Sequence, residues 1–169
     1  MNRKAGHSKA IAEFAMQNKE NVYRLAYSYV QNSEDALDVV QDSIQKALAT
    51  NNLKDSGALK SWFYRIVVNT SLDFLRRRKK VKVVDDHTLQ WHSAGREDHY
   101  KDFDLYEALN KLSPDYRTVI VLRFLEDLKI EEVAEVLDLN VNTVKTRIYR
   151  ALKILRIQLE NIEGVNQNG

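Results

Sequence analysis

The stretch that decides the fold is LKIEEVAEVLDLNVNTVKTRIYRALKILR, residues 128–156. Its first part predicts a helix buried on one face, because apolar residues recur at i, i+3, i+4 and i+7: Ile130, Val133, Ala134 and Leu137. Asp138, Leu139 and Asn140 then predict a turn, since Asp and Asn tolerate the left-handed backbone conformation. Asn140 or Asn142 is expected to cap the helix that follows.

The second helix of this stretch has two contrasting faces. Its predicted buried residues are Val144, Ile148, Ala151, Leu152, Leu155 and Leu159. The residues predicted to face a ligand are Asn140, Asn142, Thr143, Lys145, Thr146, Arg147, Arg150 and Lys153. Small polar residues followed by bases suit a major-groove helix, whose first turns reach base edges while later bases hold phosphates. The alternative is an ordinary helical hairpin with a cationic surface, but the short turn and the small Ala134 favour a DNA-binding helix-turn-helix.

Composition and periodicity predict an all-α fold with two small helical domains. The 169 residues include one Pro and five Gly, and 44% are hydrophobic, so helices around a real core are favoured. We expect a first domain over residues 1–84, an acidic linker over 85–104 and a second domain over 105–169.

The first domain is expected to hold three helices. Two lie within residues 18–48, with a break and a capping residue at 32–35, and the third runs from Leu59 into the basic segment 76–82. Their predicted apolar residues are, in order, Val22, Leu25, Ala26, Tyr29 and Val30; Ala36, Val40, Ile44, Ala47 and Leu48; and Leu59, Trp62, Phe63, Ile66, Val67 and Thr70.

The second domain is expected to begin with a short helix near Leu105. A further helix should start at Ser113, Pro114 and Asp115, which supply an N-cap, a proline at the first helical position and an acid at the positive end of the dipole. Its predicted apolar residues are Val119, Ile120, Leu122, Phe124 and Leu125.

Charge is sorted along the chain, although the net charge is only +2. Segment 76–82, RRRKKVK, has six bases and no acid, and residues 139–159 have five bases and no acid. Between them, residues 85–107 have seven acids and two bases. Two basic blocks that flank an acidic middle suggest two anion-binding surfaces, with nucleic acid as the first candidate ligand. Solvated helix faces are the alternative interpretation of either block.

The residue inventory argues against enzyme chemistry. Without Cys, disulfides and Cys-based metal or redox sites are excluded, which suits a cytosolic protein. His7, His87, His92 and His99 fit no metal-ligand spacing, and there is no Gly-rich phosphate loop. We therefore expect no catalytic residue, metal, cofactor or small-molecule substrate. We also expect no signal peptide and no membrane span, because no apolar run is long enough.

The helix-turn-helix stretch resembles region 4 of the extracytoplasmic-function sigma factors, bacterial proteins that direct RNA polymerase to promoters. The resemblance is carried by LKIEEVAE at 128–135 and TVKTRIYRA at 143–151, and LSPDYRTVIVLRFLEDL at 112–128 also looks like that family. One departure is Lys129, where a capping Ser is usual in the family.

The first domain resembles the same family in the expected order. The stretch SEDALDVVQDSIQKAL at 33–48 resembles region 2.2, and KSWFYRIVVNTSLDFLRRR at 60–78 resembles regions 2.3 and 2.4. Within the family, EDALDVVQDSI at 34–44 and GREDHYKD at 95–102 look most like the sigma-V subgroup, which responds to lysozyme.

The resemblance implies that region 4 reads the −35 promoter element and that region 2 recognises the −10 element and stabilises melted DNA. Asn69 stands at the position that helps capture a flipped-out base, with the loop 51–57 completing the pocket; a solvent-facing or capping Asn is the alternative. Phe63 is expected in the core, whereas Trp62 is left open between core and base stacking. The residues implied for the −10 element are Trp62, Arg65, Asn69, Asp73, Arg76, Arg77, Arg78, Lys79 and Lys80.

The resemblance also implies protein partners. Core RNA polymerase would be bound through its β′ clamp and β flap, and the residues expected to dock on the clamp are Asp35, Asp38, Gln41, Asp42 and Gln45. Their spacing places the acids on one helix face, for which a solvated surface is the alternative. An anti-sigma factor, usually membrane-anchored, would hold an otherwise cytoplasmic protein at the membrane and link it to a cell-envelope stress response.

Two other functions remain alternatives to a sigma factor. A free-standing transcriptional regulator would footprint a palindromic site without polymerase. A helical adaptor that binds no nucleic acid would tolerate loss of Arg147 and Arg150. Promoter binding that requires core polymerase would separate a sigma factor from both.

Overall fold

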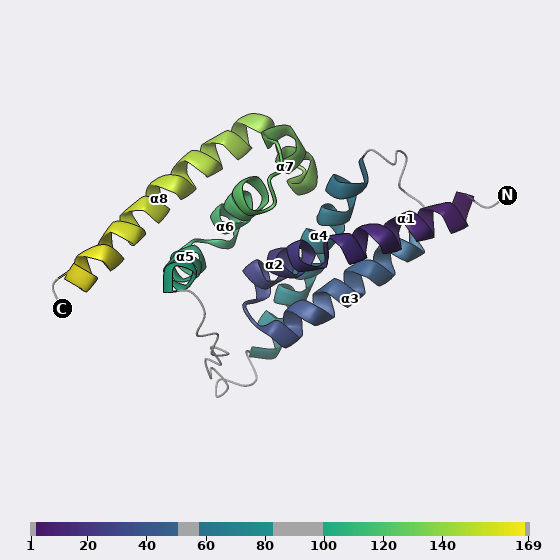
Figure 1. Cartoon of the computed structure of the whole chain (residues 1–169), viewed down its shortest axis with the longest axis horizontal. Coiled ribbons are helices and arrows are strands. Elements are labelled where there is room, and N and C mark those ends of the chain that lie inside the picture. Colours follow the sequence, from purple (N-terminus) through teal and green to yellow (C-terminus); the bar gives the residue numbers. More distant parts are fainter. Residues whose placement is uncertain (1–2, 51–57, 83–99, 168–169) are drawn as a thin grey trace.

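The computed structural model describes residues 3–50, 58–82 and 100–167. Within these ranges every regular element is helical, which confirms the predicted all-α fold (Figure 1). The elements are α1 (Arg3–Gln17), α2 (Lys19–Val30), α3 (Ser33–Ala49), α4 (Leu59–Lys82), α5 (Tyr100–Lys111), α6 (Pro114–Ile120), the π turn η2 (Val121–Leu125), α7 (Ile130–Leu137) and α8 (Val141–Gln167).

Helices α1 to α4 form the first domain. The helices α2, α3 and α4 pack against one another, and α1 lies along α3 (Figure 1). All five apolar residues predicted for α2 are buried. Phe63 of α4 is fully buried, as predicted, and its ring centroid lies 5.4 Å from that of Phe14 in α1. Asn32 caps α3, because its side chain accepts a hydrogen bond from the Asp35 N–H at 3.0 Å.

Helices α5 to α8 form the second domain. The long α8 packs against α5, α6 and α7. The helix α6 begins at Pro114, directly after Ser113 as predicted, although the Ser113 side chain makes no capping hydrogen bond. The chain continues from α6 into η2, where the Glu126 N–H donates to the Val121 carbonyl at 2.9 Å. Because a π turn holds more residues than an α turn, it changes the direction in which the following side chains point.

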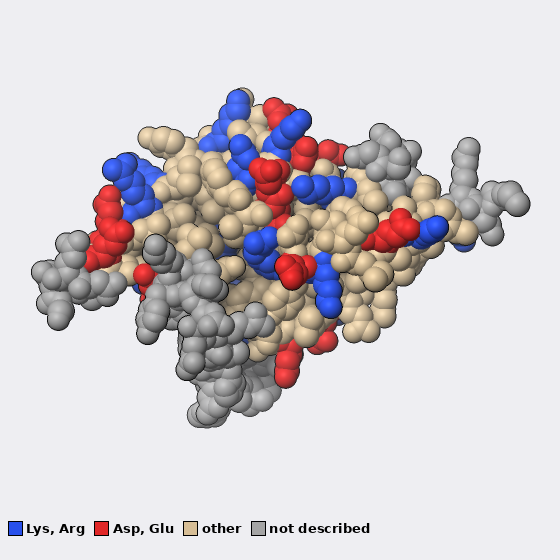
Figure 2. Space-filling view, viewed as in Figure 1, with Lys and Arg blue, Asp and Glu red and all other residues tan. Residues whose placement is uncertain are grey.

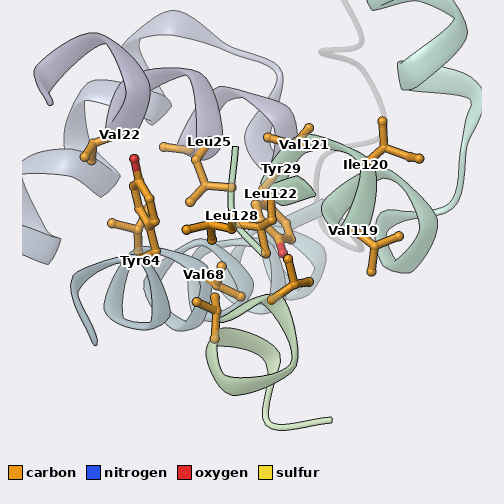
Figure 3. Close-up of a cluster of buried hydrophobic side chains, with 14 of the residues drawn as sticks. Val22, Leu25, Tyr29, Tyr64, Val68, Val119, Ile120, Val121, Leu122 and Leu128 are labelled. Carbon is orange, nitrogen blue, oxygen red and sulfur yellow. The ribbon is translucent and has the colours of Figure 1, made fainter. Parts of the chain in front are cut away.

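The two domains share one hydrophobic core. Helices α2 and α4 of the first domain pack against α6, η2 and α7 of the second. Figure 3 shows side chains from both domains in a single cluster, with Leu122 and Leu128 beside Leu25 and Tyr29. Three of these leucines, Leu25, Leu122 and Leu128, are completely buried. The two domains that the sequence predicts are therefore joined by a common hydrophobic core in the structure.

Three residues that were predicted to be buried are exposed. Leu48, Phe124 and Leu152 have 43%, 50% and 40% of their surface accessible, so these predictions are wrong. Leu152 lies about 100° around α8 from Ala151, and the buried stripe of α8 is the narrower set Val144, Ile148, Ala151 and Leu155. Leu48 lies one residue before the end of α3, and Phe124 has the Arg123 guanidinium 5.5 Å from its ring centroid.

One unpredicted helix and one helix boundary also differ from the prediction. The helix α1 was not predicted, because its apolar periodicity is weak: Ile11 is buried, while Phe14 and Ala15 are only partly covered. The helix α5 begins at Tyr100, inside the range assigned to the linker. The predicted loop 51–57 and the linker residues 83–99 lie outside the described residues.

Replacing Phe63 with Ala should strongly destabilise the first domain, because it removes a fully buried ring that packs on Phe14. We expect the free energy of unfolding, measured by urea denaturation, to fall by about 3–5 kcal/mol. Met16→Ala is the control, since Met16 is 80% exposed in the neighbouring helix, and it should change stability by less than about 0.5 kcal/mol. Similar losses in the two variants would contradict the core position of Phe63.

Candidate nucleic-acid interfaces

The helix-turn-helix has the geometry that its sequence predicts. Asp138 ends α7 in the left-handed conformation with φ 53°, and the Leu139 N–H donates to the Ala134 carbonyl at 2.9 Å. Asn140 caps α8, because its Oδ1 accepts a hydrogen bond from the Asn142 N–H at 2.8 Å. Of the two capping candidates, the structure therefore selects Asn140.

The outer face of α8 is polar and mostly open to solvent. Of the residues predicted for this face, only Arg147 is partly covered, and the exposed ones are Asn140, Asn142, Thr143, Lys145, Thr146, Arg150 and Lys153. Among the described residues, no ion pair engages Lys145, Arg150 or Lys153. These three cations are therefore available to a phosphate backbone.

A groove runs between the start of α6 and the first turns of α8. Its volume is about 530 Å³, and its lining residues are Ser113, Asp115, Tyr116, Asn142, Thr143, Thr146, Arg147 and Arg150. The Asp115 carboxylate lies 3.9 Å from an Arg147 guanidinium nitrogen, so it restricts where that side chain can point. Figure 2 shows Lys and Arg interspersed with Asp and Glu over one side of the molecule, so this side is not a uniform cationic patch.

The helix α4 presents a second polar face. Arg65, Asn69 and Arg76 are exposed on it, and Arg76 donates to Asp73 at 3.0 Å. Trp62 is partly covered and lies two helical turns before Asn69, so it borders this face instead of lying opposite to it. The structure thus brings Trp62 together with the predicted −10 residues.

The two adjacent arginines of the basic segment have different environments. Arg77 is exposed, whereas Arg78 is partly covered and donates to the Val30 carbonyl at the end of α2 at 3.0 Å. Arg78 also lies 3.6 Å from the Asp35 carboxylate. It therefore ties the end of α4 to the junction of α2 and α3, while Arg77, Lys79 and Lys80 point to solvent.

The polar face of α3 is only partly free. Asp38, Gln41 and Gln45 are exposed, while Asp42 pairs with Lys46 at 3.3 Å. Asp35 pairs with Arg78; burial raises the pKa of its carboxyl, and the nearby guanidinium opposes that rise.

A buried carboxylate at the junction of the domains was missed by the sequence analysis. Glu126 accepts hydrogen bonds from Arg24 Nε at 3.1 Å and from the Tyr64 hydroxyl at 3.2 Å, and its side chain is completely covered. Burial raises the pKa of Glu126, and Arg24, Tyr64 and Lys60 oppose the rise. A signal was present, since Glu126 lies in helical phase with Val119 and Leu122 on the apolar side.

Two family descriptions match the chain. Residues 14–81 match Sigma-70 region 2, and residues 102–155 match Sigma-70, region 4. The RNA polymerase sigma factor SigV of Bacillus subtilis strain 168 is 57% identical over 143 residues, which cover 84% of this chain and 86% of that protein. The ECF RNA polymerase sigma factor SigW of the same strain is 30% identical and covers 94% of each chain.

The chain belongs to the extracytoplasmic-function sigma factors. Members of this family bind core RNA polymerase and direct initiation at promoters through −35 and −10 elements, and this is the function of the chain. The helices α1 to α4 therefore contain sigma region 2, and α5 to α8 contain sigma region 4.

Solved sigma factors share the fold. The sigma factor RpoE in complex with the anti-sigma factor NepR from Bartonella quintana has a TM-score of 0.69 at 24% identity, and the match covers 88% of this chain and 97% of that one. CnrH in complex with the cytosolic domain of CnrY also has a TM-score of 0.69, at 25% identity, with 94% and 92% covered.

Two negative findings apply to the described part of the sigma factor. It contains no group of three or more His, Asp or Glu side chains that could hold a metal ion. None of its helices is both long and apolar enough to cross a membrane.

Replacing Arg77 and Arg78 one at a time should distinguish a cation that stabilises the fold from a cation that is available to DNA. Arg78→Ala removes the bond to the Val30 carbonyl and the Asp35 pair, so we expect a loss of about 1–2 kcal/mol in the free energy of unfolding. Arg77→Ala should change stability by less than about 0.5 kcal/mol, because Arg77 is exposed.

Promoter binding by the holoenzyme provides the second measurement. Loss of one phosphate contact in Arg77→Ala should reduce the slope of log K against log salt by about 1. If Arg78→Ala were as stable as the unsubstituted protein, the structural role of Arg78 would be disproved.

Proposed function

We propose that the two exposed polar faces of α8 and α4 are the promoter-reading surfaces of this sigma factor, at −35 and −10 respectively. The observation that carries the proposal is that each face joins hydrogen-bonding side chains to exposed cations within one helix. Base edges require the first kind of group and phosphates the second. We propose region 2 over residues 1–84, a linker over 85–104 and region 4 over 105–169.

At the −35 element, the start of α8 enters the major groove. Asn142, Thr143 and Thr146 lie in its first turns, where they meet base edges. Thr146 donates to the Asn142 carbonyl at 2.9 Å, so its hydroxyl oxygen keeps accepting capacity toward a base. The phosphate contacts come from Lys145, Arg150 and Lys153, and Arg147 is held by Asp115 in the groove.

At the −10 element, Asn69 captures an unpaired base on the exposed face of α4. An amide offers both a donor and an acceptor to the base edge. Trp62 borders the same face and offers a ring for stacking. The cations along the helix come from Arg65, Arg76, Arg77, Lys79 and Lys80. Arg78 contributes indirectly, because its bond to the Val30 carbonyl positions the end of α4.

The exposed part of α3 docks on the clamp of core polymerase. Asp38, Gln41 and Gln45 are accessible, and Asp42 is half-covered beside Lys46. Such rim charges set orientation and association rate more than affinity. Asp35, which is tied to Arg78, acts by holding the start of α3 in place.

Control by an anti-sigma factor is a further part of the proposal. Both solved relatives named above are described in complex with an anti-sigma factor or a cytosolic domain, and SigV is the relative with 57% identity. We propose that a membrane-anchored anti-sigma factor retains this protein in the cytoplasm at the membrane and releases it in an envelope stress response. We further propose that the chain itself catalyses no reaction.

The central experiment is run-off transcription with purified core polymerase on a genomic promoter library. Transcripts from a defined promoter class, absent without the sigma factor, are the expected result. Asn142→Ala and Lys145→Ala should each cost about 1–3 kcal/mol in promoter affinity, and Asn142→Ala should relax selectivity at one −35 position. Footprinting of a palindromic site by the protein alone would overturn the sigma-factor mechanism.

Asn69→Ala should change base preference at a single −10 position, because only the base held by the amide loses its partner. The measurement is run-off from promoters in which each −10 position is varied in turn. Asn161→Ala is a matched control, since Asn161 is exposed on α8 about 12 Å beyond Lys153, the last residue proposed for −35. An equal fall on every −10 variant would show that Asn69 does not form the base pocket.

A further inference from the structure

The groove beside α8 contains an acid that α8 itself does not supply. From residue 139 to residue 159 the chain has five bases and no acid. The groove is nevertheless lined by Asp115, which belongs to the first turn of α6. The Asp115 side chain has 75% of its surface accessible, so its carboxylate stands at an open edge of the groove, where a ligand can approach it.

Asp115 engages one of the four cations proposed for the −35 element. Its carboxylate lies 3.9 Å from a guanidinium nitrogen of Arg147, and the Arg147 side chain is only 29% accessible. No ion pair among the described residues engages the other three cations, which are Lys145, Arg150 and Lys153. Within the described part of the chain, Arg147 is therefore the −35 cation that already has a counterion in the free protein.

The ion pair lies on a flank of α8, beside the face that is proposed to read bases. At about 100° of rotation per residue, Arg147 is about 140° around the helix axis from Asn142 and about 40° from the buried Ala151. A helix with its side chains is about 10–12 Å wide, and the major groove is about 12 Å wide. A helix that enters the major groove therefore has a DNA backbone along each flank, and the pair lies where one of these backbones runs.

The charges in the groove oppose one another at the place where a phosphate would approach. Arg147 and Arg150 attract a phosphate, whereas the carboxylate of Asp115 repels it. The 3.9 Å between Asp115 and Arg147 is well inside the screening length of about 10 Å at 0.1 M salt, so the acid offsets the charge of this arginine. A phosphate that pairs with Arg147 must first displace Asp115.

We propose that Asp115 is an attenuating residue of the −35 interface: by pairing with Arg147 it withholds one cation from the DNA backbone and weakens binding to every duplex, without changing which bases are read. The inference rests on the proposed −35 face of α8. Phosphate contacts add affinity and salt dependence but carry no sequence information. A weaker sequence-independent affinity reduces the fraction of the sigma factor that is held at the large excess of non-specific sites in a genome.

A purely structural role for Asp115 predicts different behaviour. Asp115 lies in the first turn of α6, where a carboxylate interacts favourably with the helix dipole. If this were its whole role, Asp115→Asn would lower the free energy of unfolding and would leave the salt dependence of DNA binding unchanged. Asn retains the size and the hydrogen-bonding capacity of the side chain while it removes the charge, so the substitution separates the two roles.

The test measures the affinity of the reconstituted holoenzyme for two duplexes over a range of salt concentrations. One is a promoter identified by run-off transcription, and the other is the same promoter with its −35 element scrambled. For Asp115→Asn, the slope of log K against log salt should steepen by about 0.9 on both duplexes, because one more phosphate is engaged. The gain in affinity over the parent should shrink about threefold between 50 and 200 mM salt, and the ratio of the two duplex affinities should match that of the parent.

Glu160→Gln is the matched control for net charge. It also adds one unit of positive charge and releases an arginine, since Glu160 pairs with Arg156 at 3.2 Å, but it lies about 10 Å beyond Lys153 along α8. It should leave the slope unchanged. Asp115→Asn in an Arg147→Gln background should also leave the slope unchanged relative to Arg147→Gln, because the cation that Asp115 withholds is then absent.

Three outcomes would overturn the proposal. An unchanged slope in Asp115→Asn would leave only the structural role. A loss of affinity confined to the intact −35 duplex would show that Asp115 orients Arg147 toward a base. A steeper slope that persists in the Arg147→Gln background would show that the acid acts by repelling the phosphate and not by holding the arginine.

Arg150→Ala tests the proposed −35 face separately from this inference. It should make the slope shallower by about 0.9, because it removes a cation that has no ion pair among the described residues. If Arg150→Ala leaves the slope unchanged, the proposed −35 face is wrong. If it has the expected effect while Asp115→Asn has none, only the role of Asp115 is refuted. Circular dichroism and urea denaturation establish that each variant is folded.

Discussion

The burial of one carboxylate constrains the arrangement of the whole chain. An unpaired carboxylate could not remain ionised in an apolar interior, so Glu126 needs donors within hydrogen-bond distance in the buried position that it occupies. Arg24 and Tyr64 supply them from two different helices of region 2. Apolar contacts between α2 and η2 would tolerate a shift of one turn, whereas this three-residue contact would not. The ion pair therefore sets the register, and the surrounding leucines supply most of the free energy.

The helix α4 packs against helices of both domains and also carries the proposed −10 residues. One side, with Phe63 and Val67, closes the core of region 2, and a second side, with Tyr64 and Val68, meets region 4. The third side of α4 is polar and carries Arg65 and Asn69. Because two sides of the helix are buried, the residues proposed for the −10 element are held on a rigid support.

Local sequence patterns correctly predicted the features that depend on residues close together in the chain. The stripe Val22, Leu25, Ala26, Tyr29 and Val30 of α2 is buried as predicted, and Asp138 adopts the predicted left-handed conformation. These features depend on periodicity and on backbone preferences within one helical hairpin. The exposed polar face of α8 could be predicted from the buried stripe on the same helix, because residues opposite a buried stripe must face outward.

The remaining features depend on contacts distant in sequence. Tyr64 and Val68 were not in the predicted apolar stripe of α4, because a one-sided pattern does not indicate that a second domain covers another side. Arg78 was predicted with the phosphate-binding bases, yet its partners Val30 and Asp35 lie more than forty residues away in the chain. The sequence around these residues carries no local signal of their contacts. The basic run that contains Arg78, for example, is equally compatible with solvent, DNA or a helix terminus.

For the same reason, the distribution of charge along the sequence does not predict which cations are available to DNA. The segment 76–82 and the helix α8 are both basic in sequence, but the folded protein uses some of these cations internally. Arg78 holds α2 and α3, and Arg147 pairs with Asp115. Arg65, which precedes the basic segment on α4, pairs with Asp138. The last of these pairs joins the two regions, so one cation proposed for the −10 element lies beside a carboxylate of region 4. Intramolecular pairing therefore reduces the number of cations that a phosphate backbone can reach without side-chain rearrangement.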